Sequence, residues 1–337
     1  MTIISAPKAG RAAAPPRRRR KAAVTVLLWV FVLPFLGWAV IRLGGWERSL
    51  GVQLVAFTPY VAAAAWVPAI VALAARRWSV GAVALVIALL LAAAVLPRAI
   101  PNGDKGPADG VKLTVMTSNL LFGGADAATI VRLVKEHDVA VLALQEFTSE
   151  GKDALAAAGL GELLPHSSLA DEPGASGSAV YSRYPLTGVG AKKNGGSFRQ
   201  AYATVAVPGA GPVLVESAHP LAPWGRAVMG QWREDVLAQP RADRSGPPRV
   251  LLGDFNSTLD HTPMRQVIST GYRDAADVTG KGLTGTWGPY DGDKIPPVTI
   301  DHVLVDERLG VREVSVHGIP RSDHRAIIAA LTVPAAR

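Results

Sequence analysis

Polar side chains of the kinds that handle phosphate groups recur along this sequence at the ends of short apolar runs. The set comprises Asn119, Glu146, His219, Asp254, Asn256, Asp301, Asp323 and His324. Carboxylate and amide oxygens are ligands for hard cations such as Mg²⁺ or Mn²⁺, and the chain has no cysteine to offer a thiolate instead. A neutral imidazole held by a carboxylate can take a proton from water near pH 7, and a second imidazole with an amide can stabilise charge on a phosphoryl oxygen. Together these residue types predict metal-assisted hydrolysis of a phosphoester or phosphoanhydride.

Each of these motifs alone also has an ordinary structural explanation. An Asn at a strand end, as at Asn119, is most often a turn residue. Asp301 and His302 can form a structural pair, and Ser322 with Asp323 can cap the element that follows. The order of five such segments along one chain is what favours a site over a series of unrelated turns.

The elements that must position these residues begin near Val111. Continuous or β-branched apolar runs predict strands at Val111–Thr117, Val139–Leu144, Ser178–Ser182, Tyr202–Val207, Val213–Ser217, Val250–Leu252, Val298–Val305 and Ile327–Leu331. Helices are predicted at Asp126–Glu136 and Arg226–Ala238. This alternation indicates an α/β domain, and polar residues at strand ends are a common way to build a site on a sheet.

The motifs in order, SNL, QE, SxVYSRYPL, AHP, GDFN, TW…IDHVLV and SDHRA, resemble the endonuclease/exonuclease/phosphatase superfamily. The resemblance covers Lys112 to Val333. This superfamily includes deoxyribonuclease I-like nucleases, inositol polyphosphate phosphatases and neutral sphingomyelinases. The resemblance implies an α/β (α+β) fold: a four-layer α/β/β/α sandwich with two mixed sheets packed face to face and helices outside. It also implies Mg²⁺ as the cofactor, with Mn²⁺ as a possible substitute.

The resemblance also implies a role for each matched residue. Asn119 and Glu146 correspond to the metal-binding pair, with Glu146 the principal ligand. Asp254 and Asn256 correspond to the pair that orients the attacking water and contacts the phosphate. His219 corresponds to the histidine that hydrogen-bonds the scissile phosphate.

The C-terminal motifs complete this expected site. His324 corresponds to the terminal catalytic histidine, and Asp301 is its expected carboxylate partner. Asp323 is expected beside the metal and the phosphate. The segment Pro220–Trp224 departs from the sequence that nucleases usually have after the histidine, so nuclease specificity does not carry over.

The net charge of the chain is distributed unevenly. The 337 residues sum to +8, but residues 1–100 carry 12 Lys and Arg against one acidic residue, a net charge of +11. The remainder has 23 basic and 26 acidic residues, a net charge of −3. Binding to a nucleic-acid backbone normally uses an excess of Lys and Arg, so nucleic acid is disfavoured as a partner of the α/β domain.

The N-terminal third holds three uncharged apolar stretches, at Ala22–Ile41, Ser49–Ala75 and Trp78–Pro97. Each provides the roughly 20 apolar residues that a membrane-spanning helix needs, whereas a cleaved signal peptide has one short apolar region. We therefore predict a basic cytoplasmic tail at 1–21, three transmembrane helices within 22–98, a linker at 99–110 and an extracytoplasmic domain at 111–337. The linker is rich in Gly, Pro and Asp.

Basic residues around these stretches predict the orientation. Seven Lys and Arg with no acidic residue precede the first stretch, and Arg76 and Arg77 separate the second from the third. The first break holds only Arg42 and Arg48. The positive-inside rule then places the N-terminus in the cytoplasm and, after three crossings, the α/β domain outside a bacterial cell membrane as part of a multi-pass protein.

Apolar stretches followed by this domain resemble the membrane-bound teicoplanin-resistance (VanJ-type) phosphatases. That resemblance implies hydrolysis of undecaprenyl diphosphate, a lipid carrier of peptidoglycan synthesis, and a link to glycopeptide resistance. The expected partners are the lipid membrane and a lipid-linked diphosphate. The alternatives are a membrane-tethered nuclease, a sphingomyelinase-like phospholipase, and an inactive binding module on a membrane stalk. The sequence leaves open the exact lipid, the use of one or two metals, and the oligomeric state.

Overall fold

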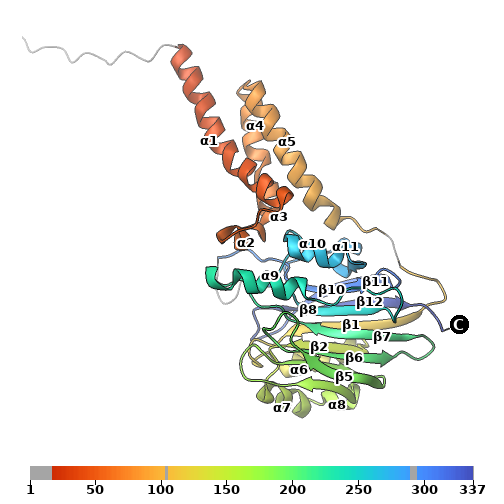
Figure 1. Ribbon diagram of the computed structural model, residues 1–337. Coiled ribbons are helices and arrows are strands. Elements are labelled where there is room, and N and C mark those ends of the chain that lie inside the picture. Colours follow the sequence, from red (N-terminus) through yellow and green to blue (C-terminus); the bar gives the residue numbers. More distant parts are fainter. Residues whose placement is uncertain (1–16, 103–104, 289–293, 337) are drawn as a thin grey trace, which may run out of the picture.

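A computed structural model describes residues 17–102, 105–288 and 294–336. Most of the predicted basic tail, at 1–16, lies outside the described residues. The chain forms two parts, an α/β domain and a group of apolar helices that projects from one side of it (Figure 1). We call the helices α1–α5 with η1, residues 17–99, the N-terminal helices.

The α/β domain is built on two six-stranded mixed sheets. The first has the order β11-β12-β1-β2-β4-β3, and the second has the order β5-β6-β7-β8-β10-β9. The strands of the first sheet are β1 Val111–Asn119, β2 Val141–Gln145, β3 His166–Ala170, β4 Ser178–Ser182, β11 Gly310–Gly318 and β12 Arg325–Val333. The strands of the second sheet are β5 Leu186–Lys192, β6 Gln200–Ala206, β7 Pro212–Ala218, β8 Arg249–Asp254, β9 Tyr272–Asp274 and β10 Asp301–Asp306. Strands β1 and β2 pair in parallel, as do β7 and β8, and the other pairs are antiparallel.

Helices cover the outer face of each sheet, which gives the four layers expected from the sequence (Figure 1). Their bounds are α6 Ala127–Glu136, α7 Ser149–Ala157 and α8 Leu160–Leu163 on the first sheet, and η2 Arg226–Val228, α9 Met229–Leu237, α10 Thr262–Ile268 and α11 Ala275–Val278 on the second. The space between the sheets is filled by aliphatic side chains such as Val115, Val180, Val215 and Leu252. This buried layer holds the strands, and therefore their ends, in fixed relative positions.

The predicted strands are all present; β4 has the predicted bounds, and the ends of the others are shifted. Strand β10 begins at Asp301 rather than Val298, because Val298 instead makes an isolated bridge with Trp287. The strands that the sequence did not predict are β3, β5, β9 and β11. All four are edge strands; β3, β5 and β11 have partly exposed side chains, and β9 has only three residues, so none carries a long apolar run.

The N-terminal helices differ from the predicted bundle of three membrane-spanning helices. Helices α1 (Arg17–Gly44) and α5 (Trp78–Val95, continued by η1 Leu96–Ala99) are long and apolar enough to cross a membrane, and within the described residues no other helix is. The middle stretch forms α2 (Leu50–Val55), α3 (Thr58–Ala64) and α4 (Trp66–Ala74). The three-helix bundle is therefore not confirmed.

Two prolines account for the broken middle stretch. Pro59 lies in the first turn of α3, where a missing N–H costs nothing, so a helix begins there. Pro68 has no N–H to donate to the carbonyl of Ala64, which matches the break between α3 and α4. Together α3 and α4 cover 17 residues, Thr58–Ala74.

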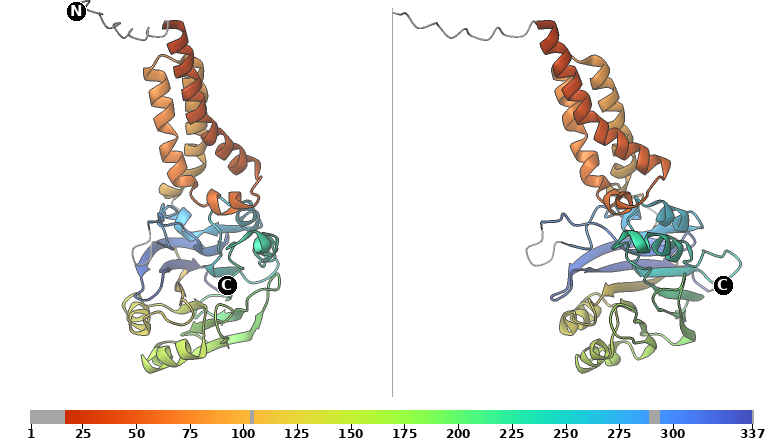
Figure 2. Two further views of the ribbon diagram at one scale, coloured as in Figure 1. Left: turned by 90° about the vertical axis from the view of Figure 1, so that its left-hand side faces the viewer. Right: turned by 60° about the vertical axis from the view of Figure 1, so that its left-hand side comes forward.

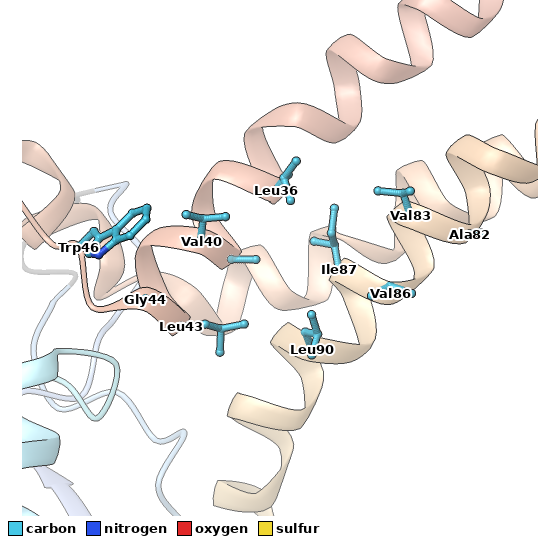
Figure 3. Close-up of a pocket in the computed structure, with 11 residues that line it drawn as sticks. Leu36, Val40, Leu43, Gly44, Trp46, Ala82, Val83, Val86, Ile87 and Leu90 are labelled. Atoms are coloured by element: carbon cyan, nitrogen blue, oxygen red, sulfur yellow. The ribbon is translucent and has the colours of Figure 1, made fainter.

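Apolar surface is exposed on these helices. Only 17% of the most apolar 18-residue stretch of α1 is buried, and Leu27, Val30 and Phe31 are each more than half exposed. A groove of about 570 Å³ between α1 and α5 is lined by apolar side chains that include Leu36 and Leu90 (Figure 3). Exposure of such apolar surface to water is unfavourable, whereas contact with the hydrocarbon of a bilayer is favourable.

Buried charges join the N-terminal helices to the α/β domain. Arg42 Nε lies 2.5 Å from Asp260 Oδ1, and Arg98 donates to both carboxylate oxygens of Asp260 at 2.7 Å. Glu47 accepts hydrogen bonds from the backbone N–H and the hydroxyl of Thr262. The base of the N-terminal helices lies beside α9–α11, as both views in Figure 2 show.

Candidate active site

The predicted site residues gather along one edge of the sandwich. Strands β1, β2, β7 and β8 end at this edge, and β10 and β12 begin there. Asp301 lies directly opposite Asp254 in the antiparallel register, and Asn119 lies opposite Gln145, the residue before Glu146. All eight residues named from the sequence are linked to one another here by contacts within 4 Å.

Asn119 joins the two sheets at the centre of the site. Its Nδ2 donates to Glu146 Oε1 at 3.2 Å and to Asp254 Oδ2 at 3.1 Å. The backbone N–H of Leu121 donates to its Oδ1, which fixes the orientation of the amide. The second oxygen of Glu146 accepts a hydrogen bond from the N–H of Phe122 at 2.8 Å. Both acidic side chains are therefore held in place from the first sheet.

His324 is held by a carboxylate on one side and faces two others. Its Nδ1 lies 2.9 Å from Asp301 Oδ2, and its Nε2 lies 3.7 Å from Asp254 Oδ2 and 3.9 Å from Asp323 Oδ1. A carboxylate at Nδ1 favours the proton on that nitrogen, so Nε2 is the atom presented to the site. The hydroxyl of Ser322 accepts from the N–H of His324 and donates to the Asn119 carbonyl, which fastens this loop to β1.

The second imidazole approaches from the other sheet. His219 Nε2 lies 3.7 Å from Asp254 Oδ2, and the His219 ring packs against Phe198 with centroids 4.7 Å apart. The N–H of Asn256 donates to Asp254 Oδ1, and its side-chain amide donates to the Pro220 carbonyl at 3.0 Å. Asp254 is thus flanked by both imidazoles and two asparagines.

The backbone at this edge adopts unusual conformations. Glu146 and Asn256 have positive φ values of 55° and 47°, a region that non-glycine residues seldom occupy. Gly253 has φ 155°, and a Cβ there would lie 2.0 Å from the Ala218 carbonyl oxygen. Only glycine therefore lets β7 and β8 bring His219 and Asp254 this close.

The surroundings shift the pKa values of the two imidazoles in opposite directions. Burial, together with the positive charge of His324, lowers the pKa of His219 to about 3. Burial also lowers the pKa of His324, but Asp301 and Asp254 outweigh it and raise the pKa to about 10. Burial raises the pKa of Asp254 to about 7, against the opposing effect of His324. With protein groups alone, His219 is therefore neutral and His324 is cationic at neutral pH. The sequence predicts a neutral imidazole as the base, and His324 becomes neutral near pH 7 only if additional positive charge nearby lowers its pKa.

The donor atoms fit a divalent cation. Ligand atoms of Asp254, Asp301 and His324 lie within 4.8 Å of one another, and Asp323 Oδ1 is buried without a hydrogen bond from any described residue. Glu146 adds a fourth carboxylate, so four acidic groups face one imidazolium. Such an excess of buried negative charge is costly unless a cation offsets it. The compact three-residue group shares no residue with the metal set predicted from the sequence, Glu146, Asn119 and Asp323, although Asn119 contacts Asp254 and Asp323 lies 3.9 Å from His324.

Several contributing residues were not assigned from the sequence. Trp287 Nε1 donates to Asp323 Oδ2 at 2.9 Å, and Phe198 packs on His219. Trp287 could have been predicted from the TW pair in the motif TW…IDHVLV, whereas no sequence motif includes Phe198. His302 lies outside the site, because its two ring nitrogens contact Asp274 and the Ser257 carbonyl.

Comparisons with known proteins identify the family and agree with the fold. The model of the Endonuclease/Exonuclease/phosphatase family matches residues 116–324. An endonuclease/exonuclease/phosphatase from Beutenbergia cavernae is 21% identical, with a TM-score of 0.51 over 66% of this chain and 72% of that chain. A family protein from Bacteroides thetaiotaomicron is 18% identical, with a TM-score of 0.51 over 67% and 99%. A 3′ phosphatase from Neisseria, bound to a product DNA hairpin, is 20% identical, with a TM-score of 0.51 over 64% and 98%. Comparison with curated proteins gives no match.

Proposed function

The chain belongs to the endonuclease/exonuclease/phosphatase family, and we propose that it is a metal-dependent phosphohydrolase held at a membrane that acts on a lipid-linked diphosphate. Undecaprenyl diphosphate, or a related lipid diphosphate, is the proposed substrate, which would link the protein to cell-wall synthesis and glycopeptide resistance. The proposal rests on one observation: carboxylates, amides and two imidazoles lie together in a domain that is joined to apolar helices. The joint is the buried ion cluster of Arg42, Arg98 and Asp260.

Glu146, Asn119 and Asp323, with Asp254, are the residues that would hold Mg²⁺ or Mn²⁺. Once bound, the ion would supply positive charge to the phosphate oxygens. The chain itself places the neutral His219 beside Asp254, where its Nε2 can contact a phosphoryl oxygen.

His324 presents Nε2 at the position from which it can exchange a proton with water or phosphate. In the proposed hydrolysis, water attacks the terminal phosphorus and the bond to the bridging oxygen breaks. That oxygen leaves with the lipid monophosphate, and inorganic phosphate is the second product. Asp254 and Asn256 lie where they can orient the attacking water, beside the two imidazoles.

The arrangement of the N-terminal helices supports a membrane location and the proposed orientation. The start of α1, in the basic run ending at Lys21, and the α4–α5 turn with Arg76 and Arg77 both lie at the end remote from the α/β domain (Figure 1). By the positive-inside rule, that end is cytoplasmic and the α/β domain is outside. We propose that α3 and α4 complete the membrane part with α1 and α5, although α3–α4 is shorter than either.

The proposal is tested by the products that purified full-length protein releases: inorganic phosphate from undecaprenyl diphosphate, shortened strands from duplex DNA and phosphocholine from sphingomyelin. Undecaprenyl diphosphate in mixed micelles is compared with duplex DNA and sphingomyelin at equal phosphate concentration. We expect hydrolysis of the lipid diphosphate in preference to the other two. Preferential cleavage of DNA or of sphingomyelin would instead identify the nuclease or the phospholipase alternative.

Chelation is expected to abolish this phosphate release, because the carboxylate excess then lacks its counter-charge. Added Mg²⁺ or Mn²⁺ should restore the rate. The measurement is the rate after EDTA treatment, with the same EDTA saturated by Mg²⁺ as the control. A rate that does not change on chelation would contradict the metal requirement.

A further inference from the structure

The segment Pro220–Trp224, which departs from nuclease sequences, leads away from the site. It follows His219 directly, and its first carbonyl accepts the side-chain hydrogen bond from Asn256. The N–H of Leu221 donates to the buried Asp235 on α9, which fixes the start of the segment. The segment therefore leads from the catalytic edge to the protein surface.

Helix α2 packs against the far end of this segment. Gln53 Nε2 donates to the Pro223 carbonyl at 2.8 Å. On the same helix, Val52 and Val55 are buried, and the Val52 carbonyl contacts Nε2 of the buried His261. One face of α2 thus packs against the α/β domain, and Gln53 joins the helix to the segment that follows His219.

The outward side of this contact is apolar. Trp224 is 70% exposed, and Leu50 and Leu54 on α2 are 55% and 50% exposed. Trp46, between α1 and α2, is 66% exposed. Exposed side chains of this size on adjoining segments indicate a surface that something covers.

The position of this apolar patch, which consists of Trp46, Leu50, Leu54 and Trp224, indicates what covers it. Helix α2 follows the domain-proximal end of α1, at the base of the projecting helices (Figure 1). If α1 spans a bilayer, this level is the membrane–water interface, where tryptophan with its apolar body and polar N–H is favoured. Trp46 lines the groove together with Val40 and Leu43, so it lies against the apolar surface of α1.

We propose that Trp224, Leu50 and Leu54 form a bilayer-contacting edge that seats the segment after His219 on the lipid headgroups. This contact brings lipid-borne phosphate to the edge where His219 and Asp254 lie. The proposal rests on the proposed function, because it gives the membrane a direct part in substrate delivery.

The absence of cysteine permits a direct test. The Trp224→Cys variant, labelled with an environment-sensitive fluorophore, is reconstituted into vesicles of phosphatidylethanolamine and phosphatidylglycerol. We expect a blue-shifted emission that lipid-borne quenchers reduce. Val189→Cys is the matched control, because Val189 is 54% exposed on β5, at the opposite end of the domain from α2. Equal quenching at the two positions would overturn the proposal, as would a label shielded from aqueous quencher but not quenched from lipid, which would indicate a protein partner.

A second arm measures turnover. Trp224→Ser is expected to raise KM for vesicle-borne undecaprenyl diphosphate about tenfold. Its kcat/KM for a water-soluble five-carbon prenyl diphosphate should stay at the wild-type value. An equal loss on both substrates would contradict a membrane role for Trp224. If wild-type protein hydrolyses neither substrate, the proposed function fails, whereas the quenching result still decides whether this edge contacts lipid.

Discussion

Replacing His324 with alanine is expected to lower kcat for phosphate release by about 10²-fold or more, the range for loss of an acid–base group. The imidazole is fixed by Asp301 and presents Nε2 toward Asp254 and Asp323, where a reacting phosphate group or water would lie. His219 cannot replace it as a proton carrier near neutral pH, because burial and the positive charge of His324 lower the pKa of His219 to about 3.

The control for this variant is His166→Ala, on the edge strand β3 and outside the site. It should retain the wild-type kcat. Asp301→Asn leaves the imidazole in place but removes the carboxylate that fixes its tautomer, so its kcat should also fall. Purified, folded His324→Ala protein that turns over at a rate near wild type would remove His324 from the mechanism.

The composition of this site was predictable because strand ends are local features. Continuous apolar runs locate β1, β2 and β8, and the polar residue that ends each run must lie at a sheet edge. The pairing of Asp301 opposite Asp254 was not predictable, because it depends on antiparallel register between strands about 45 residues apart. The two carboxylates that raise the pKa of His324 are brought together by that register, so the raised pKa was not predictable either.

The attachment of the N-terminal helices illustrates the limit of sequence reasoning more sharply. Arg42 and Arg98 read as ordinary basic residues flanking apolar stretches. Their common partner, Asp260, lies 218 and 162 residues away along the chain, beyond the reach of any periodicity. Hydropathy likewise registers the apolar content of Ser49–Ala75 but not the effect of Pro68 on helix continuity.

Asp260→Asn is expected to destabilise the protein by about 3–5 kcal/mol, because it leaves two buried guanidinium groups without their carboxylate. The side chain of Asp260 is 0% exposed, and those of Arg42 and Arg98 are each 8% exposed. Burial raises the pKa of Asp260, but the two arginines outweigh it and hold the pKa below its usual value, so the carboxylate is ionised at neutral pH. Its contribution to stability should be present above the ordinary aspartate range and lost as pH falls through the lowered pKa.

The measurement is thermal unfolding of the full-length protein in detergent, where this loss corresponds to a decrease in Tm of about 10 °C. Asp138→Asn is the matched control, because Asp138 also pairs with an arginine, Arg183, but is 71% exposed, so its loss should cost at most about 1 kcal/mol. Replacing Arg42 and Arg98 with Met and Asp260 with Leu in one protein removes all three charges and should recover most of the lost stability. Equal melting of Asp260→Asn and Asp138→Asn would mean that the ion cluster does not fasten the helices to the domain. A large loss restored in the triple variant would show that the cost arises from uncompensated charge at this joint.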